Sequence, residues 1–218
     1  MRRMVCLVPV LGLVVMCAVG CSAAAATPHE ADSKTILITS GPTWRTSHGG
    51  RFIGMAQNVC LTPSVPANCP AGAVNYGYGG GGWTADLSAI PGATWIWAPR
   101  INGRSPNASL SSYRFSRRIT IHGHVLNATL YIASDDLVRI KVNGKKVGRW
   151  GTVTNREKAG RAAARLKSFD ITALLTQGVN RMSVWAENGP DSFAGCSPCT
   201  YQQNPAGVVF GWSITVAQ

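Results

Sequence analysis

The sequence predicts an all-β protein, an antiparallel β-sandwich with one short helical turn. The first observation is the segment 127–147 (NATLYIASDDLVRIKVNGKKV), in which apolar residues stand among polar ones as in half-buried strands. The second is the break at Asn143-Gly144, because a type I′ hairpin turn needs positive φ at both central residues. The third is composition: only 14% of the 218 residues are charged, with 24 Gly and 7 Trp, which is typical of a compact β-protein. Reversals this short predict that consecutive strands are antiparallel neighbours.

The first 26 residues are predicted to be a leader rather than part of the fold. Two arginines precede an apolar run at 5–19 that is too short for a comfortable membrane span. The run ends in Ala-Val-Gly-Cys at 18–21, which resembles the lipobox of bacterial lipoproteins, in which the cysteine, here Cys21, is lipidated. This predicts export and a lipid anchor in the cell envelope. Cleavage after the three alanines at 24–26 is the alternative, and it predicts a secreted protein.

Residues 27–33 are an expected tether, and 34–218 an expected single domain without internal repeats. Alternation and β-branched or aromatic content predict the strands, and clusters of Gly, Pro and Asn separate them. The expected strands are 35–39 (TILIT), 51–56, 93–98 (ATWIWA), 113–121 (YRFSRRITI), those within 127–147, 166–169, 181–186 (RMSVWA) and 207–216 (GVVFGWSITV).

Three long connections and one helical turn complete the prediction. Residues 58–82, 101–111 and 188–206 are loops rich in Gly, Pro and Asn. Residues 170–175 (DITALL) are the expected helical turn, with Asp170 as its cap. The basic, alanine-rich stretch 151–164 predicts either a loop or a short exposed helix.

The order of these segments resembles the galactose-binding-like jelly roll. It is most similar to the non-catalytic sandwich that precedes the catalytic domains of family 2 glycosidases and α-L-rhamnosidases. The most specific pieces are the strand–Asp-Asp–strand–Val-Asn-Gly-Lys unit around residue 136 and the segment FDITALLTQGVN at 169–180. The resemblance covers roughly 35–216 and implies a jelly-roll fold, which by itself says little about the ligand.

Four cysteines predict two disulfides. The chain has seven cysteines, of which two lie within the leader and Cys21 is the candidate lipid site. An even remainder in an exported protein indicates disulfides. Four cysteines allow three pairings, and local pairing is favoured: Cys60–Cys69 and Cys196–Cys199. The second pair has the C-x-x-C spacing of redox sites, but it lies in a Pro/Gly loop between strands, which favours a structural bridge.

A binding site is expected at one end of the sandwich. If the strands simply reverse, the loops 101–111 and 188–206, the chain after residue 150 and the Asp135-Asp136 turn all reach the same end. Aromatic rings against sugar C–H surfaces and planar polar groups against hydroxyls predict six ligand-binding candidates there: Trp150, Tyr201, Asn102, Arg100, Asp136 and Asn188. For each of them a structural role, as an edge aromatic, loop or turn residue, is the alternative.

The other aromatic and metal-ligating residues favour structure over chemistry. Trp95, Trp97, Trp185 and Trp212 lie within expected strands and are predicted core, whereas Trp44 and Trp83 fit either a surface site or a core cover. Asp135-Asp136 could help to bind calcium, but that ion wants six or more oxygens, so a plain turn is favoured. His122 and His124 lack further zinc ligands in the sequence. Neither a metal nor a cofactor is therefore expected.

The charge balance admits a polyanion as partner. The formal charge is +12, and 12 − 2 = +10 after loss of the two leader arginines. The basic residues form separate groups at 117–118, 145–146 and 156–167, which fits a soluble basic surface or an anion site in the last group.

Enzymatic activity is not expected. Nine acidic residues provide no evident pair for glycoside hydrolysis, and there is no G-x-S-x-G motif. The sequence therefore predicts a non-catalytic carbohydrate-binding module with a glycan or polysaccharide as partner and the membrane as support. The alternatives are a structural or adhesive envelope lipoprotein that binds a protein, and a polyanion binder. Nucleic acid is not expected as a partner.

Overall fold

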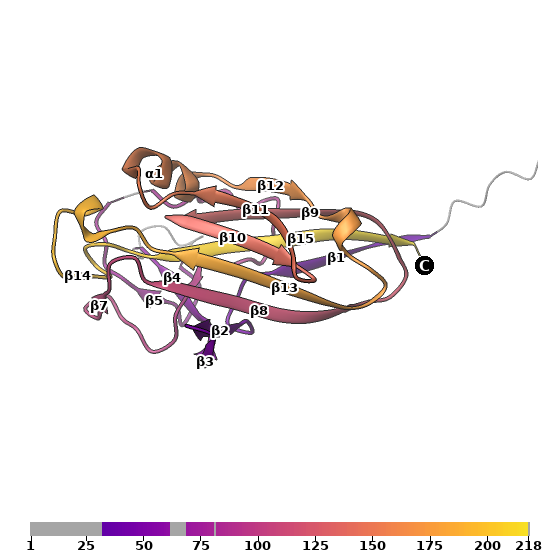
Figure 1. The fold of residues 1–218 in the computed structure, drawn as a ribbon, viewed down its shortest axis with the longest axis horizontal. Helices are drawn as coiled ribbons and strands as arrows, with labels where there is room; N and C mark the ends of the chain where they lie inside the picture. The colour runs from indigo at the N-terminus through magenta and orange to yellow at the C-terminus, as the bar shows by residue number, and fades with distance from the viewer. Residues whose placement is uncertain (1–31, 62–68, 81, 218) are drawn as a thin grey trace, which may run out of the picture. The chain divides into compact units, whose positions relative to one another are not determined.

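The fold is formed by two β-sheets that pack face to face (Figure 1). The computed structural model describes residues 32–61, 69–80 and 82–217, so the predicted leader, Cys21 and most of the tether lie outside this range. Residues 31–218 form one compact unit. Within the described ranges, no helix is both long enough and apolar enough to cross a bilayer.

The seven-stranded sheet has the order β12-β9-β15-β6-β4-β5, with β1 also paired to β15. Its pairs are antiparallel except β4 with β5. Its strands are β1 (Ser33–Thr39), β4 (Gln57–Cys60), β5 (Val74–Asn75), β6 (Ile96–Trp97), β9 (His124–Asp135), β12 (Lys167–Asp170) and β15 (Gly207–Ala217).

The six-stranded sheet has the order β11-β10-β13-β8-β2-β3 and is antiparallel throughout. Its strands are β2 (Arg45–His48), β3 (Arg51–Met55), β8 (Ser112–Ile121), β10 (Leu137–Val142), β11 (Lys145–Gly151) and β13 (Gly178–Glu187). A separate short ladder joins β7 (Pro106–Asn107) to β14 (Cys199–Thr200). The all-β sandwich that the sequence predicts is confirmed.

One prediction about strand pairing is wrong. The turn at residues 122–123 and the Asp135-Asp136 turn do not join paired neighbours, because β8 and β10 belong to the six-stranded sheet and β9 to the seven-stranded sheet. Each of these turns carries the chain from one layer to the other. The Asn143-Gly144 hairpin is as predicted: both residues have positive φ, 50° and 80°, and β10 pairs with β11.

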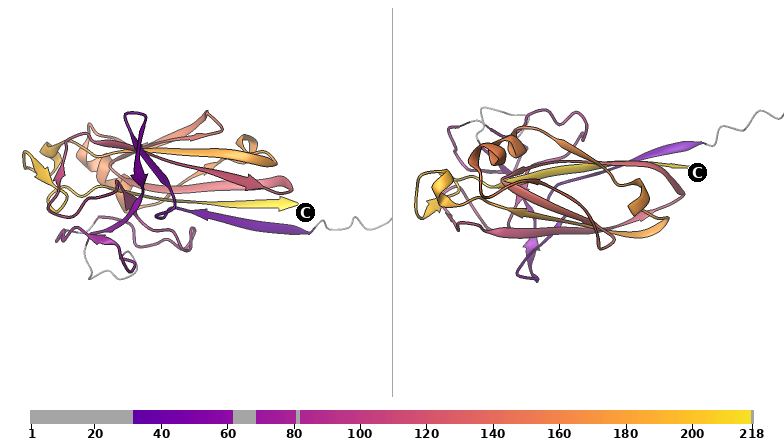
Figure 2. Two further views of the ribbon diagram at one scale, coloured as in Figure 1. Left: turned by 90° about the horizontal axis from the view of Figure 1, so that it is seen from below. Right: turned by 45° about the horizontal axis from the view of Figure 1, so that its top comes forward.

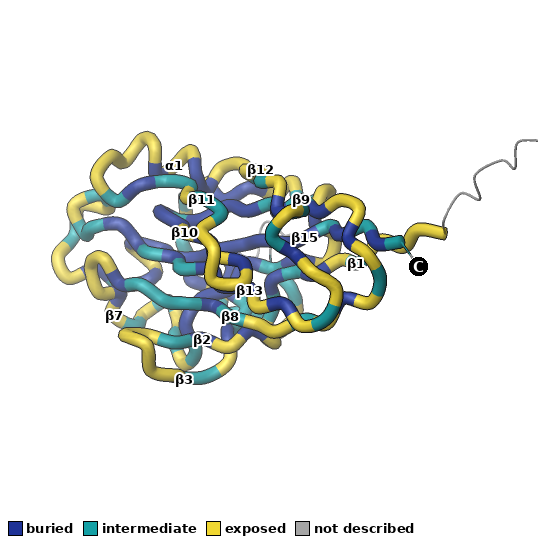
Figure 3. The backbone as a smooth tube through the Cα atoms, turned by 45° about the vertical axis from the view of Figure 1, so that its right-hand side comes forward, coloured by how far each residue is buried: buried dark blue, intermediate teal, exposed yellow. Residues whose placement is uncertain are grey.

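The core between the sheets is rich in tryptophan. Trp44, Trp95, Trp97 and Trp212 are fully buried, and the interior strands are the buried part of the chain in Figure 3. The rings pack on one another: Trp44 stacks on Trp212 with centroids 5.2 Å apart, and Trp83 stacks on Trp95 at 4.2 Å. Full burial of one such side chain contributes roughly 2–3 kcal/mol. The core assignment is therefore correct for three of the four strand tryptophans.

Trp185 is the exception, because it points away from the core. Its neighbours Met182, Val184 and Ala186 in β13 are fully buried and face the other sheet. Since side chains alternate along a strand, Trp185 lies on the outer face, where it is partly exposed.

The stretch 151–164, for which the sequence leaves a loop or a short helix open, contains a helix. Residues Arg156–Ala164 form α1, whose N-cap Asn155 accepts a hydrogen bond from the Lys158 N–H at 2.9 Å. Short 3₁₀ turns lie at Thr172–Leu174 (η2) and Asp191–Phe193 (η3). The Asp170 carboxylate accepts from the Thr172 N–H at 2.9 Å, but the N-cap of η2 is Ile171, so Asp170 is not the cap that the sequence predicts. Figure 2 shows α1 lying at one end of the sandwich.

Both predicted disulfide pairings are present. Cys60 at the end of β4 is bonded to Cys69, with the two Cα atoms 5.1 Å apart. Cys196 is bonded to Cys199, with Cα atoms 5.2 Å apart, next to the short β7–β14 ladder. Each bond closes a loop within one connection, so neither links the two sheets.

Candidate functional site

The long loops meet at one end of the sandwich, at the left of Figure 1. Three backbone contacts join them: β14 pairs with β7, the Asn188 N–H donates to Ser111 O at 2.9 Å, and the Thr152 N–H donates to Asp136 O at 3.2 Å. We call this the loop end. It contains residues 101–111, 135–136, 151–164 and 188–206, the four segments that strand reversal predicts to lie together.

The opposite end, which we call the turn end, consists of short reversals at 122–123, 143–144 and 172–178. The chain also enters the fold there, because Ser33 at the start of β1 pairs with Ala217, and Ala217 pairs with His124. Whatever precedes residue 33 is therefore attached at the pole opposite the loop end.

A cleft of about 310 Å³ opens at the loop end, and we call it the rim cleft. Aromatic, acidic, amide and basic side chains line it together. They come from the chain after β5, the β9–β10 turn, α1 and the 188–206 loop: Tyr78, Trp83, Asp135, Asp136, Arg156, Phe193, Gln203 and Asn204.

Two consecutive aspartates form part of the cleft wall, and each accepts a hydrogen bond from another segment. Asp135 accepts from the indole N–H of Trp83 at 2.8 Å, and Asp136 accepts from the Gly189 N–H at 2.5 Å. Burial, followed by the adjacent Asp136 carboxylate, raises the pKa of Asp135 well above its usual range. Burial also raises the pKa of Asp136. Burial thus favours the protonated form of both carboxyls.

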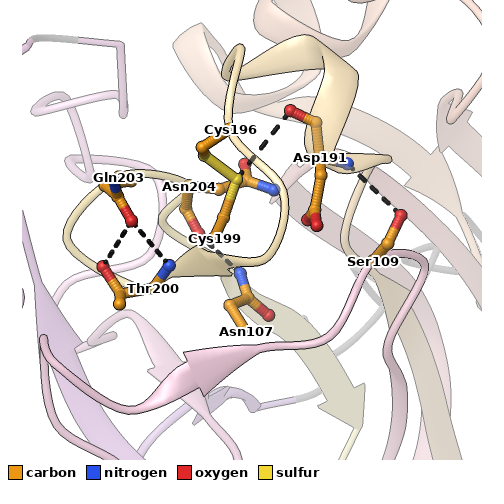
Figure 4. Close-up of a disulfide and its surroundings, with 8 residues drawn as sticks. All are labelled: Asn107, Ser109, Asp191, Cys196, Cys199, Thr200, Gln203 and Asn204. Carbon is orange, nitrogen blue, oxygen red and sulfur yellow. Dashed lines mark hydrogen bonds between the residues drawn. A yellow bond between two sulfur atoms is a disulfide. The ribbon is translucent and has the colours of Figure 1, made fainter.

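Two buried asparagine side chains at the loop end have amide atoms without a hydrogen-bond partner among the described residues. Asn204 lines the cleft, is 7% exposed, and its side-chain Nδ2 has no hydrogen-bond partner among the described residues. Asn188 is fully buried, and neither Nδ2 nor Oδ1 has a partner there. Figure 4 shows how Asn204 is held: its backbone O accepts from Asn107 Nδ2, close to the Cys196–Cys199 disulfide. Because this nitrogen is itself buried, its missing partner is a cost to the fold that an ordered water, or a rearrangement when a ligand binds, would offset.

Trp83 both covers the core and borders the rim cleft. It is 8% exposed and covers the core through its stack on Trp95, yet one edge lines the rim cleft. Its bond to Asp135 fixes the ring relative to the β9–β10 turn. The loop that carries Trp83 is thereby tied to the cleft floor.

Of the six predicted ligand residues, the rim cleft contains only Asp136. The sequence places Tyr201 in the site, but the structure places its side chain in the core. Its ring stacks on Tyr76 with centroids 5.2 Å apart, and its hydroxyl accepts from the Trp97 indole N–H at 3.2 Å. Burial raises the pKa of the Tyr201 hydroxyl above its usual value. Asn188 is at the loop end but buried, so it supports the cleft without lining it.

The other three candidates lie outside the cleft. Trp150 packs beneath α1, with its indole N–H donating to Ala162 O at 3.2 Å and Arg165 5.4 Å from its ring. Asn102 is exposed, and its Oδ1 closes a local turn by accepting from the Arg104 N–H. Arg100 is exposed with φ of 62°, and its N–H donates to Gln57 Oε1. The structure does not bring these three side chains together with Asp136.

The sequence contains weak signals for the cleft residues that were missed. Tyr78 lies within a run of glycines, and Asn204 precedes a proline, both common in exposed loops. Nothing in a loop's sequence tells which side chain turns inward, because loops lack the periodicity of strands.

The described residues contain no group of three or more His, Cys, Asp and Glu side chains placed to hold a metal ion. His122 and His124 are exposed at the turn end. The Asp135-Asp136 pair is engaged by Trp83 and Gly189 instead.

Comparison with known proteins points to glycosidases. Residues 123–208 match the family model of the α-L-rhamnosidase N-terminal domain. An α-L-rhamnosidase of Streptomyces avermitilis is 27% identical over 111 residues, which are 50% of this chain and 10% of that protein. The chain thus spans about a tenth of this curated relative.

Solved structures give similar neighbours. The Streptomyces avermitilis α-L-rhamnosidase complexed with L-rhamnose has a TM-score of 0.42 at 23% identity. The aligned part is 55% of this chain and 10% of the rhamnosidase chain. An FMN-binding β-glucuronidase of Faecalibacterium prausnitzii has a TM-score of 0.39 at 14% identity. The aligned part is 84% of this chain and 23% of the glucuronidase chain.

The matched segment runs from the turn before β9 into β15 and includes the β9–β10 turn and α1. It therefore contains Asp135, Asp136, Arg156, Phe193 and Asn204 of the rim cleft. This segment is similar to the N-terminal domain of α-L-rhamnosidases, as the sequence resemblance predicts.

Proposed function

We propose that the protein is a non-catalytic carbohydrate-binding module and that the rim cleft is its glycan site. The observation that carries this proposal is that one cleft combines the partly exposed rings of Tyr78 and Phe193 with the exposed polar side chains of Arg156 and Gln203. Apolar sugar faces pack on aromatic rings, and sugar hydroxyls need fixed donors and acceptors. A cleft of about 310 Å³ has room for one or two sugar rings.

The arrangement of the carboxyls argues against glycoside hydrolysis. Glycoside hydrolases place two carboxyl groups on either side of the bond that is cleaved. These groups are roughly 5–5.5 Å apart in retaining enzymes and roughly 6.5–9.5 Å apart in inverting enzymes, which need room for a water molecule. Asp135 and Asp136 are instead consecutive residues whose carboxylates accept hydrogen bonds from Trp83 and Gly189. Their role in this proposal is to fix the cleft wall and to offer carboxyl oxygens to hydroxyl groups.

The ligand class follows from the relatives. The curated relative is an α-L-rhamnosidase, so neutral oligosaccharides ending in L-rhamnose are the first probes, within a wider array of neutral glycans. Tyr78→Ala removes one cleft ring, and we expect it to weaken binding about tenfold or more. Tyr131→Ala is the matched control, since Tyr131 lies in β9 outside the cleft lining and should leave the affinity within about twofold.

Equal loss in both variants, or no neutral glycan bound by the unsubstituted protein, would refute the assignment. Trp150→Ala serves as a further comparison. It removes the aromatic residue that the sequence suggests for the site, but that side chain lies beneath α1 outside the rim cleft. Binding lost in Trp150→Ala and retained in Tyr78→Ala would place the site beside α1 instead.

Export with a lipid on Cys21 completes the proposal. The chain enters the fold at the turn end, so a tether to a membrane would leave the rim cleft at the far pole. Mass spectrometry of the mature protein from its native host tests this: a diacylglyceryl adduct on an N-terminal Cys21 is expected. An unmodified N-terminus after residue 26 would show the secreted alternative.

A further inference from the structure

The outer face of the six-stranded sheet carries an arginine-lined groove of about 490 Å³, separate from the rim cleft. It lies over β2, β8 and β13 and is bordered by Gly50 and Phe52 of the β2–β3 hairpin. No acidic residue lines it. Five arginines do: Arg45, Arg114, Arg117, Arg118 and Arg181.

Strand register explains why four of these charges gather there. Arg117 is the exception, because it stands opposite the buried Met182 at a core-facing parity but is exposed. Phe115 in β8 and Val184 in β13 are buried and face the core, so the alternate positions face outward. Arg118 stands directly opposite Arg181 on β13, and Arg114 stands opposite Trp185. Like charges directly opposite each other destabilise a sheet, so the fold bears a cost that an anionic ligand would relieve.

The groove arginines have no carboxylate partner. The two ion pairs found in the described part of the chain are Arg139–Glu187 and Arg161–Glu157, and neither includes a groove residue. Arg114 Nε is buried without a hydrogen-bond partner in that same part. Guanidinium groups pair with carboxylates through two parallel hydrogen bonds, which makes planar carboxylates the complementary ligand.

Aromatic rings lie among the arginines. Arg45 lies 4.2 Å from the centroid of the Phe52 ring, and Arg114 lies 5.2 Å from that of Trp185. Beyond Trp185 the basic surface continues onto β10, where Lys141 lies 5.6 Å from the same ring.

We infer that this groove binds a carboxylate-bearing polysaccharide, such as a polyuronate, at a site distinct from the rim cleft. The arginines pair with the carboxylates, and a sugar chain that continues past Arg114 packs a ring face on Trp185, which lines the adjoining pocket of about 230 Å³. A polymer of bases is a poorer match, because single-stranded nucleic acid sites stack successive bases on several exposed rings. The inference shares with the proposed function only the premise that the ligands are glycans.

The test uses residues 31–218, which contain the whole compact unit, with polygalacturonate as probe and neutral galactan as comparison. We expect saturable binding to polygalacturonate that weakens about tenfold or more between 50 and 300 mM salt, since exposed charges are screened over these concentrations. Arg118→Gln/Arg181→Gln should weaken it about tenfold or more. This variant removes a like-charge pair, so it should remain folded.

Lys34→Gln/Lys167→Gln is the matched control, because it removes the same charge from exposed positions of the seven-stranded sheet. It should change the affinity by about twofold at most. Trp185→Leu keeps every charge and should still weaken binding. Equal losses in the two charge variants, equal binding of galactan, or tighter binding of oligo(dT) or phosphatidylglycerol vesicles would overturn the inference.

The two sites fail separately. Tyr78→Ala should leave polygalacturonate binding unchanged, and Arg118→Gln/Arg181→Gln should leave neutral glycan binding unchanged. If the unsubstituted protein binds only one of the two ligand classes, the assignment of the other site is the one that is wrong.

Discussion

The two ends of the sandwich differ in how their buried asparagine side chains are hydrogen-bonded. At the turn end, fully buried Asn180 makes four hydrogen bonds: Oδ1 accepts from Asn143 Nδ2 and the Thr176 N–H, and Nδ2 donates to Thr176 O and Gly178 O. At the loop end, fully buried Asn188 and nearly buried Asn204 have side-chain atoms without described partners. Satisfied polar groups hold a structure together, whereas unsatisfied ones are a cost that a ligand or ordered water offsets. The difference separates the structural pole of the molecule from the pole at which we propose that a ligand binds.

Asn180→Leu should show the largest effect. Leucine is close to asparagine in size but leaves the Thr176 and Gly178 backbone groups without their side-chain partner. We expect the free energy of unfolding to fall by about 3 kcal/mol. Urea unfolding followed by tryptophan fluorescence measures it, and a loss below about 1 kcal/mol would mean that this network does not hold the turn end.

Asp135→Asn tests the acidic pair of the rim cleft through pH. The folded-state pKa of Asp135 is raised, so between its ordinary value and the raised one the native state binds more protons than the unfolded state. The free energy of unfolding should therefore fall as pH rises above about 4. Asparagine does not titrate and can still accept from Trp83, so the variant should lose much of this fall.

Urea midpoints of both proteins at pH 4.5 and pH 7 give the comparison. The stability of Asp135→Asn relative to the unsubstituted protein should be higher at pH 7 than at pH 4.5. The reverse order would show that Asp135 is ionised and stabilised in the native state.

Asn188→Leu should have the smallest effect. It is the same substitution at another fully buried asparagine, just beyond the end of β13, but it removes polar atoms that have no described partner. Removal of an unsatisfied buried polar group is near neutral, so we expect a change within about 1 kcal/mol. A loss similar to that of Asn180→Leu would erase the contrast between the two ends.

The strand pattern of this chain could be predicted because alternation records which side of a strand is buried. Val138, Ile140 and Val142 alternate with Arg139 and Lys141, and the Asn143-Gly144 turn sets the reversal. Alternation does not record which strand is the neighbour. The Asp135-Asp136 turn reads like a hairpin, but it carries the chain to the other sheet.

The site was less predictable because it depends on loops. Strand reversal was enough to place the long loops at one end. It could not show that Tyr201 turns into the core or that Asn204 borders the cleft, since a loop has no repeating inward direction. The outward position of Trp185 was readable, because Arg181 and Ser183 share its parity while Met182 and Val184 do not.

Amide chemical-shift mapping tests the central contrast most directly. Labelled residues 31–218 are titrated with the tightest-binding neutral oligosaccharide from the glycan array. The account predicts shifts at Tyr78, Asp136, Asn204 and the indole N–H of Trp83, with none at the Asn143-Gly144 turn. Shifts centred on the turn end, or none at the rim cleft at saturating ligand, would contradict it.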